Sequence, residues 1–310
     1  VKAFAEKNNI SYNYFRPLED STNSRIESIK SAIDKGAKIV VCPGYLLEDA
    51  IYDVQDQYPN VAFLLLDGEP HSTDYSDYKT GPNVHCILYK EEQGGYLAGY
   101  AAVKEGFRNL AFIGGIDVPA VIRFGYGYIQ GIDAAATELD LGQGAVKVKY
   151  DYAGGFSATD DLKSQMDSWY TSGTDVVFAC GGAIYLSVTK AAEEQNKKVI
   201  GVDSDQSSVS ETIITSALKD LTESVNIALT SFFDNGMKWD EAHSGKTITL
   251  GAKEKTIGLP TNSSSWRFTT FTVEEYQNIF NKMADGTIAV NDSTSTRPTP
   301  SNRLIVEFLG

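Results

Sequence analysis

The 310-residue sequence predicts two α/β units, each built on a doubly wound parallel sheet. Short apolar runs alternate with helix-length segments through residues 1–205. Many of these runs are continuously apolar, as in strands that helices cover on both faces. The runs are too numerous for one doubly wound sheet of ordinary width, and the chain is long enough to form two hydrophobic cores.

The first third of the chain alternates helices and strands. Residues 1–9 have helical spacing of apolar side chains, whereas 11–17 (SYNYFRP) resemble a strand. A helix over 21–35 is indicated by polar capping residues at its start and by Ile26, Ile29 and Ile33 at helical spacing. We then expect a strand at 37–42 buried on both faces, a helix at 46–58, strands at 61–67 and 84–89, and a helix at 91–106.

The same alternation continues to residue 205 and then loosens. The pattern predicts strands at 109–115, 145–152, 174–182 and 198–205, with helices at 119–139, 158–170 and 184–195 between them. Beyond about residue 210 we expect a strand at 211–219, a helix at 221–235, a short hairpin formed by 246–251 and 255–260, a helix at 271–283, and a last strand at 303–310 after a Ser/Thr/Pro-rich loop.

The boundary between the units is expected near Gly106, where a helix ends and a new strand begins. The predicted first lobe contains residues 1–107 and roughly 237–285. The second lobe contains 108–236, and residues 286–310 form a C-terminal tail and strand.

Composition and motifs exclude several classes of function. A net charge of −14, spread along the chain, repels nucleic acid and anionic lipid and suits a neutral or cationic small ligand. The three cysteines, Cys42, Cys86 and Cys180, lie in apolar strand-like runs and are interpreted as buried thiols. With only three scattered histidines and no P-loop, G-x-G-x-x-G turn or G-x-S-x-G elbow, the sequence predicts no enzyme, metal site or cofactor.

Candidate ligand-binding residues follow the predicted strands, because open α/β sheets bind ligands at the carboxyl ends of their strands. Glycines at these ends let a ligand approach the backbone, and carboxylates accept hydrogen bonds from vicinal hydroxyls. The candidates are Gly44, Tyr45, Asp67, Gly68, Gly114 to Asp117, Gly154 to Phe156, Gly181, Gly182, and Asp203 to Gln206.

Each candidate also has a simpler interpretation. Asp67 is equally suited to cap a helix, and Gly181 and Gly182 fit a tight turn between a strand and a helix. Phe156, flanked by glycines in GGFSATD, is interpreted as an exposed platform for stacking a ring. The carboxylates of Asp203 and Asp205 crowd one strand end, which also fits a glycosidase or a Ca²⁺-assisted nucleoside hydrolase.

Six segments in order resemble the basic membrane protein family of bacterial substrate-binding lipoproteins, which includes PnrA-like purine nucleoside receptors of ABC importers. They are EEQGGYLAGYAA, LAFIGGIDVPAVIRFGYGYIQGI, YAGGFSATD, DVVFACGGAIYLSVTKAAEE, VIGVDSDQ and ITSALKDL. The resemblance implies a type I periplasmic-binding-protein fold with a ligand cleft between two lobes, and hinge closure on a purine nucleoside. It also implies a monomer that is lipid-anchored at the cell surface as a full-length precursor and is read by a membrane permease.

Carried over by motif, the resemblance gives Phe156 a stacking role and gives Asp203 and Lys219 the ribose hydroxyls. Gly181 and Gly182 would line the pocket with backbone groups, and Gly44, Tyr45 and Asp67 would contribute from the first lobe. Lys219 also fits a solvated lysine at a strand end.

The family's opening strand and its Asp…Phe-Asn segment, which supplies a second stacking ring, would precede Val1. Riboflavin or another small molecule therefore stays open as the ligand. A nucleoside-cleaving enzyme and a regulatory ligand sensor are the alternative classes.

Overall fold

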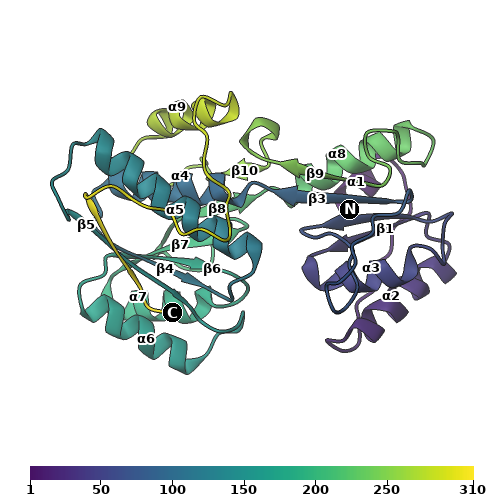
Figure 1. Cartoon of the computed structure of the whole chain (residues 1–310), viewed down its shortest axis with the longest axis horizontal. Coiled ribbons are helices and arrows are strands. Elements are labelled where there is room, and N and C mark those ends of the chain that lie inside the picture. The colour runs from purple at the N-terminus through teal and green to yellow at the C-terminus, as the bar shows by residue number, and fades with distance from the viewer. The chain divides into compact units, whose positions relative to one another are not determined.

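The computed structural model describes residues 1–310, which divide into two units (Figure 1). Unit 1 contains Val1–Tyr89 and Leu221–Leu250, and unit 2 contains Lys90–Asp220 and Gly251–Gly310. The chain therefore passes between the units after Tyr89, after Asp220 and after Leu250.

These boundaries differ from the predicted ones, because two helices and the segment 251–285 pack with the other unit. Helix α4 (Glu91–Glu105) lies along α5 (Pro119–Glu138) and shares its hydrophobic cluster, so it belongs to unit 2. Helix α8 (Leu221–Asp234) belongs to unit 1. There Phe233 stacks on Phe4 of α1 (Lys2–Lys7), with the ring centroids 5.9 Å apart. Residues 251–285 pack in unit 2 rather than in unit 1.

Unit 1 has a four-stranded parallel sheet in the order β1-β2-β3-β9. Its strands are β1 (Ile39–Pro43), β2 (Ala62–Leu66), β3 (Val84–Tyr89) and β9 (Lys246–Leu250). Apolar side chains of α2 (Thr22–Asp34) and α3 (Glu48–Val54) form a core with β1, β2 and β3. Ser21 caps α2 as predicted, by accepting a hydrogen bond from the backbone N–H of Ser24.

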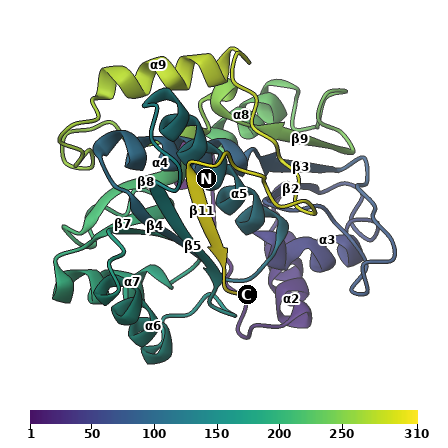
Figure 2. The same ribbon diagram turned by 60° about the vertical axis from the view of Figure 1, so that its left-hand side comes forward.

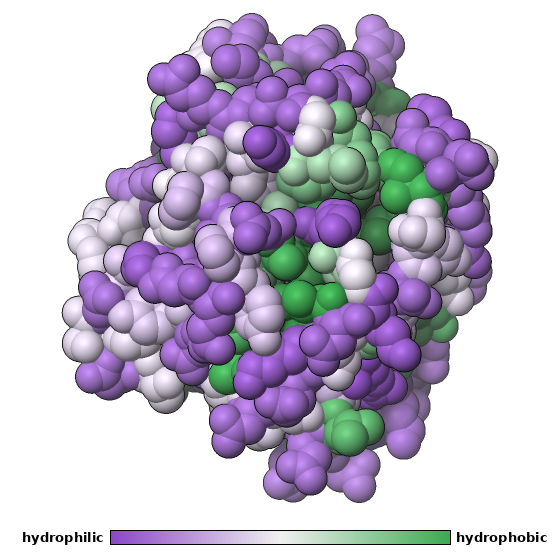
Figure 3. All heavy atoms as spheres, turned by 90° about the vertical axis from the view of Figure 1, so that its right-hand side faces the viewer, coloured by the Kyte–Doolittle hydropathy of each residue, from purple (hydrophilic) through white to green (hydrophobic).

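Strand β1 is less buried than its apolar sequence predicts. It is an edge strand, so Ile39, Val40 and Val41 are half-buried and only Cys42 is fully buried. Figure 3 shows one face of the molecule, on which some hydrophobic residues are exposed among hydrophilic ones. The continuous apolar run therefore correctly indicates a strand here, but the prediction of burial on both faces is wrong.

The strand predicted at 11–17 is also wrong, since this segment has no β-pairing partner and is irregular. Its alternating tyrosines imitate a strand pattern, but Tyr14 is 84% exposed. Period-two alternation therefore does not by itself create a strand when no neighbouring strand pairs with it.

Unit 2 has a seven-stranded sheet in the order β10-β8-β7-β6-β4-β5-β11. All neighbours are parallel except β10, which is antiparallel to β8. The strands are β4 (Asn109–Gly114), β5 (Val146–Tyr152), β6 (Val176–Cys180), β7 (Lys198–Asp203), β8 (Ile213–Lys219), β10 (Ile257–Gly258) and β11 (Leu304–Phe308). Figure 2 shows β11 lying beside β5 at one edge.

Helices cover both faces of the unit 2 sheet, as the continuous apolar strands predict (Figure 1). Helices α4 and α5 share one hydrophobic cluster with one face, and α9 (Val273–Ala284) adds residues to it. Helices α6 (Asp160–Thr171) and α7 (Tyr185–Gln195) form a second cluster with the other face. Phe124, Tyr126 and Tyr128 of α5 are all buried, which is consistent with a packing role in the core.

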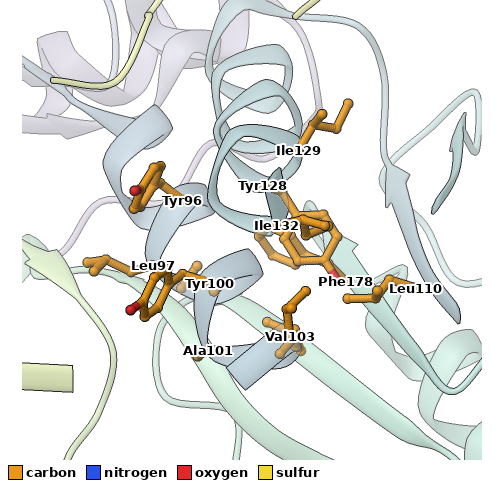
Figure 4. Packing of buried hydrophobic residues seen from close by; sticks show 14 of the residues in the cluster. Tyr96, Leu97, Tyr100, Ala101, Val103, Leu110, Tyr128, Ile129, Ile132 and Phe178 are labelled. Carbon is orange, nitrogen blue, oxygen red and sulfur yellow. The ribbon is translucent and has the colours of Figure 1, made fainter. Parts of the chain in front are cut away.

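The backbones of α4 and α5 approach each other closely because each helix has glycines four residues apart. A Cβ placed on Gly95 would lie 2.0 Å from the carbonyl oxygen of Phe124, and one on Gly127 would lie 2.1 Å from that of Glu92. Gly99 and Gly131 have equivalent contacts. Around this contact Tyr96 and Tyr100 of α4 and Tyr128 of α5 add aromatic packing (Figure 4).

The hairpin predicted from 246–251 and 255–260 is wrong. Strand β9 joins the unit 1 sheet beside β3, and β10 joins the unit 2 sheet beside β8. The short spacing imitates a hairpin because the chain passes between the units at this point. The three cysteines are buried and free, as predicted. No helix combines the length and apolar character that a membrane span requires.

Candidate ligand-binding site

The carboxyl ends of four adjacent parallel strands bring the predicted residues of unit 2 to one edge of its sheet. Gly114 at the end of β4 is in register with Cys180 at the end of β6. Asp203 at the end of β7 is in register with Leu218, one residue before Lys219 on β8. This is the edge at which open α/β sheets bind ligands.

The Phe156 ring packs closely against the backbone of glycine residues. A Cβ on Gly115 would lie 2.2 Å from Cδ1 of Phe156, and one on Gly181 would lie 2.7 Å from Cε1. The backbone carbonyl of Phe156 also accepts a hydrogen bond from the N–H of Ala183 at 2.7 Å. The ring is half-buried and packs partly on the core, so it is less exposed than the sequence predicts.

Glycine is required at positions 181 and 182 for two reasons: the backbone conformation and the close contact with Phe156. Their φ angles are +134° and +51°, in the range that favours glycine. A Cβ on Gly182 would also lie 2.6 Å from the carbonyl oxygen of Phe156. The predicted tight turn is therefore present, and the same residues shape the seat of the Phe156 ring.

Asp203 and Lys219 form a charged pair at this edge. Nζ of Lys219 lies 3.8 Å from Oδ1 of Asp203, whose side chain is 46% exposed, whereas that of Lys219 is 4% exposed. The ammonium also lies 5.5 Å from the centre of the Phe124 ring. Lys219 is therefore not the solvated lysine of the simpler interpretation, because its side chain is buried among charged and aromatic groups.

Glu91, the first residue of α4, lies beneath this pair and is fully buried. Its Oε1 is 3.2 Å from Nζ of Lys219, and its Oε2 accepts a hydrogen bond of 2.6 Å from Nε of Arg123. The contact with Lys219 is an ion pair without hydrogen-bond geometry. Neither Glu91 nor Arg123 was expected from the sequence, since an acidic residue at a helix start ordinarily interacts with the helix dipole.

The neighbouring carboxylate, Asp205, is held in a turn. It accepts hydrogen bonds from the Ser265 hydroxyl and from the backbone N–H of Ser207, and these interactions outweigh burial and lower its pKa. The amide of Gln206 is likewise used within the protein, because its Oε1 accepts from the N–H of Val202. Asp203 and Asp205 therefore have different surroundings and are not equivalent carboxylates.

Gly44, Tyr45 and Asp67 come together at the carboxyl ends of β1 and β2 in unit 1. The N–H of Gly44 donates to the carbonyl of Leu66, which directly precedes Asp67. Gly44 has a φ of +102°, and Asp67 adopts the left-handed region at +65°. Asp67 caps no helix, since the next helix along the chain begins at Glu91. Tyr45 is 39% exposed.

The Cys180 thiol at the end of β6 is buried beside the charged pair. Burial raises its pKa well above the usual range, and the charges of Asp203 and Glu91 raise it further while Lys219 lowers it. The thiol is therefore protonated and inert at neutral pH. No group of three or more His, Cys, Asp or Glu side chains is arranged to hold a metal ion.

Comparison of the chain with known proteins identifies the family that it matches. A family model described as "ABC transporter substrate-binding protein PnrA-like" matches residues 1–294. Basic membrane protein A1 of Borrelia garinii subsp. bavariensis is 29% identical over 248 residues, which cover 79% of this chain and 69% of that protein.

Solved structures of solute-binding proteins have a similar fold. That of an ABC transporter solute-binding protein from Conexibacter woesei matches with a TM-score of 0.72 at 18% identity, covering 94% of this chain and 91% of that one. One from Aeropyrum pernix K1 matches with a TM-score of 0.68 at 20% identity, covering 93% and 80%.

Proposed function

Because the chain belongs to the PnrA-like family of ABC transporter substrate-binding proteins, we propose that its ligand is a purine nucleoside, bound by closure of its two units. Substrate-binding proteins of ABC transporters act outside the cytoplasmic membrane, bind small ligands and present them to a membrane permease. The proposal concerns the ligand and the residues that hold it. The lipid anchor and the monomeric state expected from the resemblance stay predictions.

The observation that carries the proposal is the arrangement of Phe156, Asp203 and Lys219 at one sheet edge. Phe156 lies against glycines at the ends of β4 and β6, and the charged pair lies at the ends of β7 and β8. The Phe156 ring contacts glycines that follow β4 and β6, and β6 is the direct neighbour of β7, so the two groups lie one to two strand spacings apart, about 5–10 Å. This separation suits an aromatic base at one end and a sugar at the other.

The chemistry of each group fits one half of a nucleoside. An aromatic ring stacks on a purine without requiring charge, and stacking of this kind contributes about 1–3 kcal/mol. The carboxylate of Asp203 accepts hydrogen bonds from vicinal hydroxyls, and the ammonium of Lys219 donates to them. Gly44, Tyr45 and Asp67, which meet at the equivalent edge of unit 1, are proposed to complete the site.

Closure follows from a ligand that contacts both units. Such a ligand favours the closed state by the difference between its affinities for the closed and the open state. The permease would then recognise the closed form.

Calorimetric titration with inosine tests the proposal. Asp203→Ala is expected to weaken binding at least tenfold, because a charge-assisted hydrogen bond contributes about 1.5–3 kcal/mol. Asp205→Ala is the matched control, since its carboxylate bonds to Ser265 and Ser207 within the protein. Equal affinities for the parent protein and Asp203→Ala would remove Asp203 from the site.

Two further measurements separate the alternatives. Riboflavin titrated into the same protein distinguishes a flavin receptor from a nucleoside receptor. Prolonged incubation with inosine, followed by chromatography for free hypoxanthine, tests the nucleoside-cleaving alternative. Release of base at a rate proportional to protein concentration would contradict a purely binding role.

A further inference from the structure

Glu91 is a buried charge that the proposed ligand contacts do not use. Its side chain is 0% exposed, and it ends between two cations from different elements, Arg123 of α5 and Lys219 of β8. A carboxylate taken wholly out of water is costly unless partners offset its desolvation. Here the two cations and the N-terminal end of α4 provide that compensation.

Together with Asp203 these residues form a balanced cluster of two positive and two negative charges. The cluster is asymmetric in exposure. Asp203 is 46% exposed at the sheet edge, Lys219 is 4% exposed, and Glu91 lies fully inside. Lys219 is thus the link between a buried anion and an accessible one.

We propose that Glu91 is the positioning residue of the site, which holds the Lys219 ammonium beside Asp203 so that both face the ligand. The inference rests on the proposed function, because it assigns a role to Glu91 in binding the same ligand. A lysine side chain has four flexible methylene groups and a strongly hydrated head, so its placement at a binding edge requires a fixed partner. Fixing the ammonium before the ligand arrives reduces the ordering cost of binding.

Arg123 has a supporting role in this arrangement. Its Nε donates a hydrogen bond of 2.6 Å to Oε2 of Glu91. The other carboxylate oxygen, Oε1, then faces Lys219. The groups that face the Lys219 ammonium include Glu91 from α4, Asp203 from β7, the Phe124 ring from α5 and the protonated Cys180 thiol from β6. Glu91 is the nearest anion among them.

The test is Glu91→Gln, which keeps the size of the side chain and an oxygen for Arg123 but removes the charge. Inosine affinity at pH 7 is expected to fall about tenfold. This loss corresponds to one charge-assisted hydrogen bond between the Lys219 ammonium and the ligand. The deficit should grow as the pH rises toward 9, because a buried ammonium without its nearest anion loses its proton more readily. The parent protein is measured at the same pH values as the reference, because the base of inosine itself loses a proton as the pH rises. Glu92→Gln is the matched control, since Glu92 is the adjacent buried acid of α4 and has no ion pair with Lys219; its affinity should stay within twofold.

A second measurement needs no ligand. The ¹³Cε shift of Lys219, assigned by its loss in Lys219→Met, is followed against pH in the free proteins. The Lys219 ammonium is expected to titrate at lower pH in Glu91→Gln than in the parent. Identical titration in both would overturn the positioning role. So would an affinity loss in Glu91→Gln that does not change with pH, or an equal loss in Glu92→Gln.

The two proposals fail in distinguishable ways. If the parent does not bind inosine while the Lys219 titration shifts, the nucleoside assignment is wrong and the coupling of Glu91 to Lys219 holds. If Glu91→Gln does not fold, Glu91→Asp retains the charge but shortens its reach by one methylene. It should then shift the Lys219 titration in the same direction by less, and an unshifted titration would contradict the inference.

Discussion

At the scale of single residues, the glycines beneath Phe156 are as important as the aromatic ring itself. Gly115 and Gly181 leave space that any Cβ would fill, at 2.2 and 2.7 Å from the ring. Unlike Gly181, Gly115 does not have a positive φ, so alanine at this position adds volume without backbone strain.

Gly115→Ala is therefore expected to displace the Phe156 ring. Inosine affinity should fall about tenfold, as for Phe156→Ala, because the stacking surface is lost or tilted. Overpacking should also lower the free energy of unfolding by about 1–3 kcal/mol. Gly155→Ala is the control, since its Cβ would meet nothing within 4 Å. Calorimetry and urea denaturation measure the two effects. Normal affinity in Gly115→Ala would show that the position of the ring does not matter.

A second residue-scale feature is Glu92, whose carboxyl group is buried and whose Oε2 has no hydrogen-bond partner. Burial, and then the adjacent charge of Glu91, raise its pKa from 4.5 to about 7, although Arg123 lowers it and Asp292 raises it further. The folded protein therefore holds a proton on Glu92 that the unfolded chain releases above pH 4.5.

This shift predicts a loss of stability as the pH rises. A carboxyl group with a raised folded-state pKa destabilises the protein increasingly between its unfolded value, 4.5, and its folded value, about 7. Glu92→Gln removes this contribution, so the stability difference in its favour should grow by about 3 kcal/mol from pH 4.5 to 8. Urea denaturation of both proteins across this range measures it. A constant difference between them would contradict the raised pKa.

At the scale of elements, the contact between α4 and α5 depends on glycine. Gly95 and Gly94 are adjacent on α4, but they differ in what a Cβ would meet. On Gly95 it would lie 2.0 Å from backbone oxygen, and on Gly94 it would lie 3.0 Å from the side chain of Phe124. Backbone cannot move aside as a side chain does.

We therefore expect Gly95→Ala to separate the two helices and Gly94→Ala to be tolerated. In an ordinary helix, replacing glycine by alanine stabilises by about 1 kcal/mol. For Gly95→Ala we expect a net loss of about 2 kcal/mol or more, while Gly94→Ala should lie within about 1 kcal/mol of the parent. Thermal unfolding followed by circular dichroism distinguishes them. Equal stabilities would mean that the helices can adjust without cost.

Most elements could be predicted from the sequence because their signals are local. The continuous apolar runs of β2, β4 and β6 and the capped start of α2 need no knowledge of distant residues. The errors came from pairing, which is not local. Residues 11–17 have a strand pattern but no partner, and 246–251 and 255–260 resemble a hairpin but pair in different sheets.

The candidate site could be predicted in part for the same reason. Glycines and aspartates after strands can be recognised in sequence, so Phe156, Gly181 and Asp203 are candidates from the sequence alone. Glu91 precedes β8 by more than 120 residues and contacts Lys219 only because α4 lies in unit 2. The predicted boundary near Gly106 placed that helix in the first lobe, which hid the interaction.

At the scale of the whole molecule, three segments of the chain join the units. Beside each of them, a residue of unit 2 forms an ion pair or a hydrogen bond within that unit. Glu91 and Lys219, which form an ion pair, adjoin two of them, at Lys90 and Asp220. The third is held by Gln93, whose Oε1 accepts a hydrogen bond of 2.8 Å from the N–H of Ala252. Glu91 and Lys219, which are proposed to act on the ligand, therefore lie directly beside two of the three segments that join the units.

Closure itself predicts a change in size. The radius of gyration measured by small-angle X-ray scattering should fall when saturating inosine is added to the parent protein. Asp203→Ala at the same inosine concentration should show a smaller decrease. A radius that stays constant while calorimetry reports binding would contradict hinge closure.

The position of β9 has a consequence for the order of folding. It completes the unit 1 sheet beside β3, with His85 opposite Lys246, so most of unit 2 separates these partners along the chain. A chain that emerges with its amino end first can pair β4 to β8 before β9 exists. Until then the outer side of β3 is an open strand edge, and such edges are prone to pair with other molecules. The interval before β9 arrives is therefore when the edge of β3 is open to pairing with another chain.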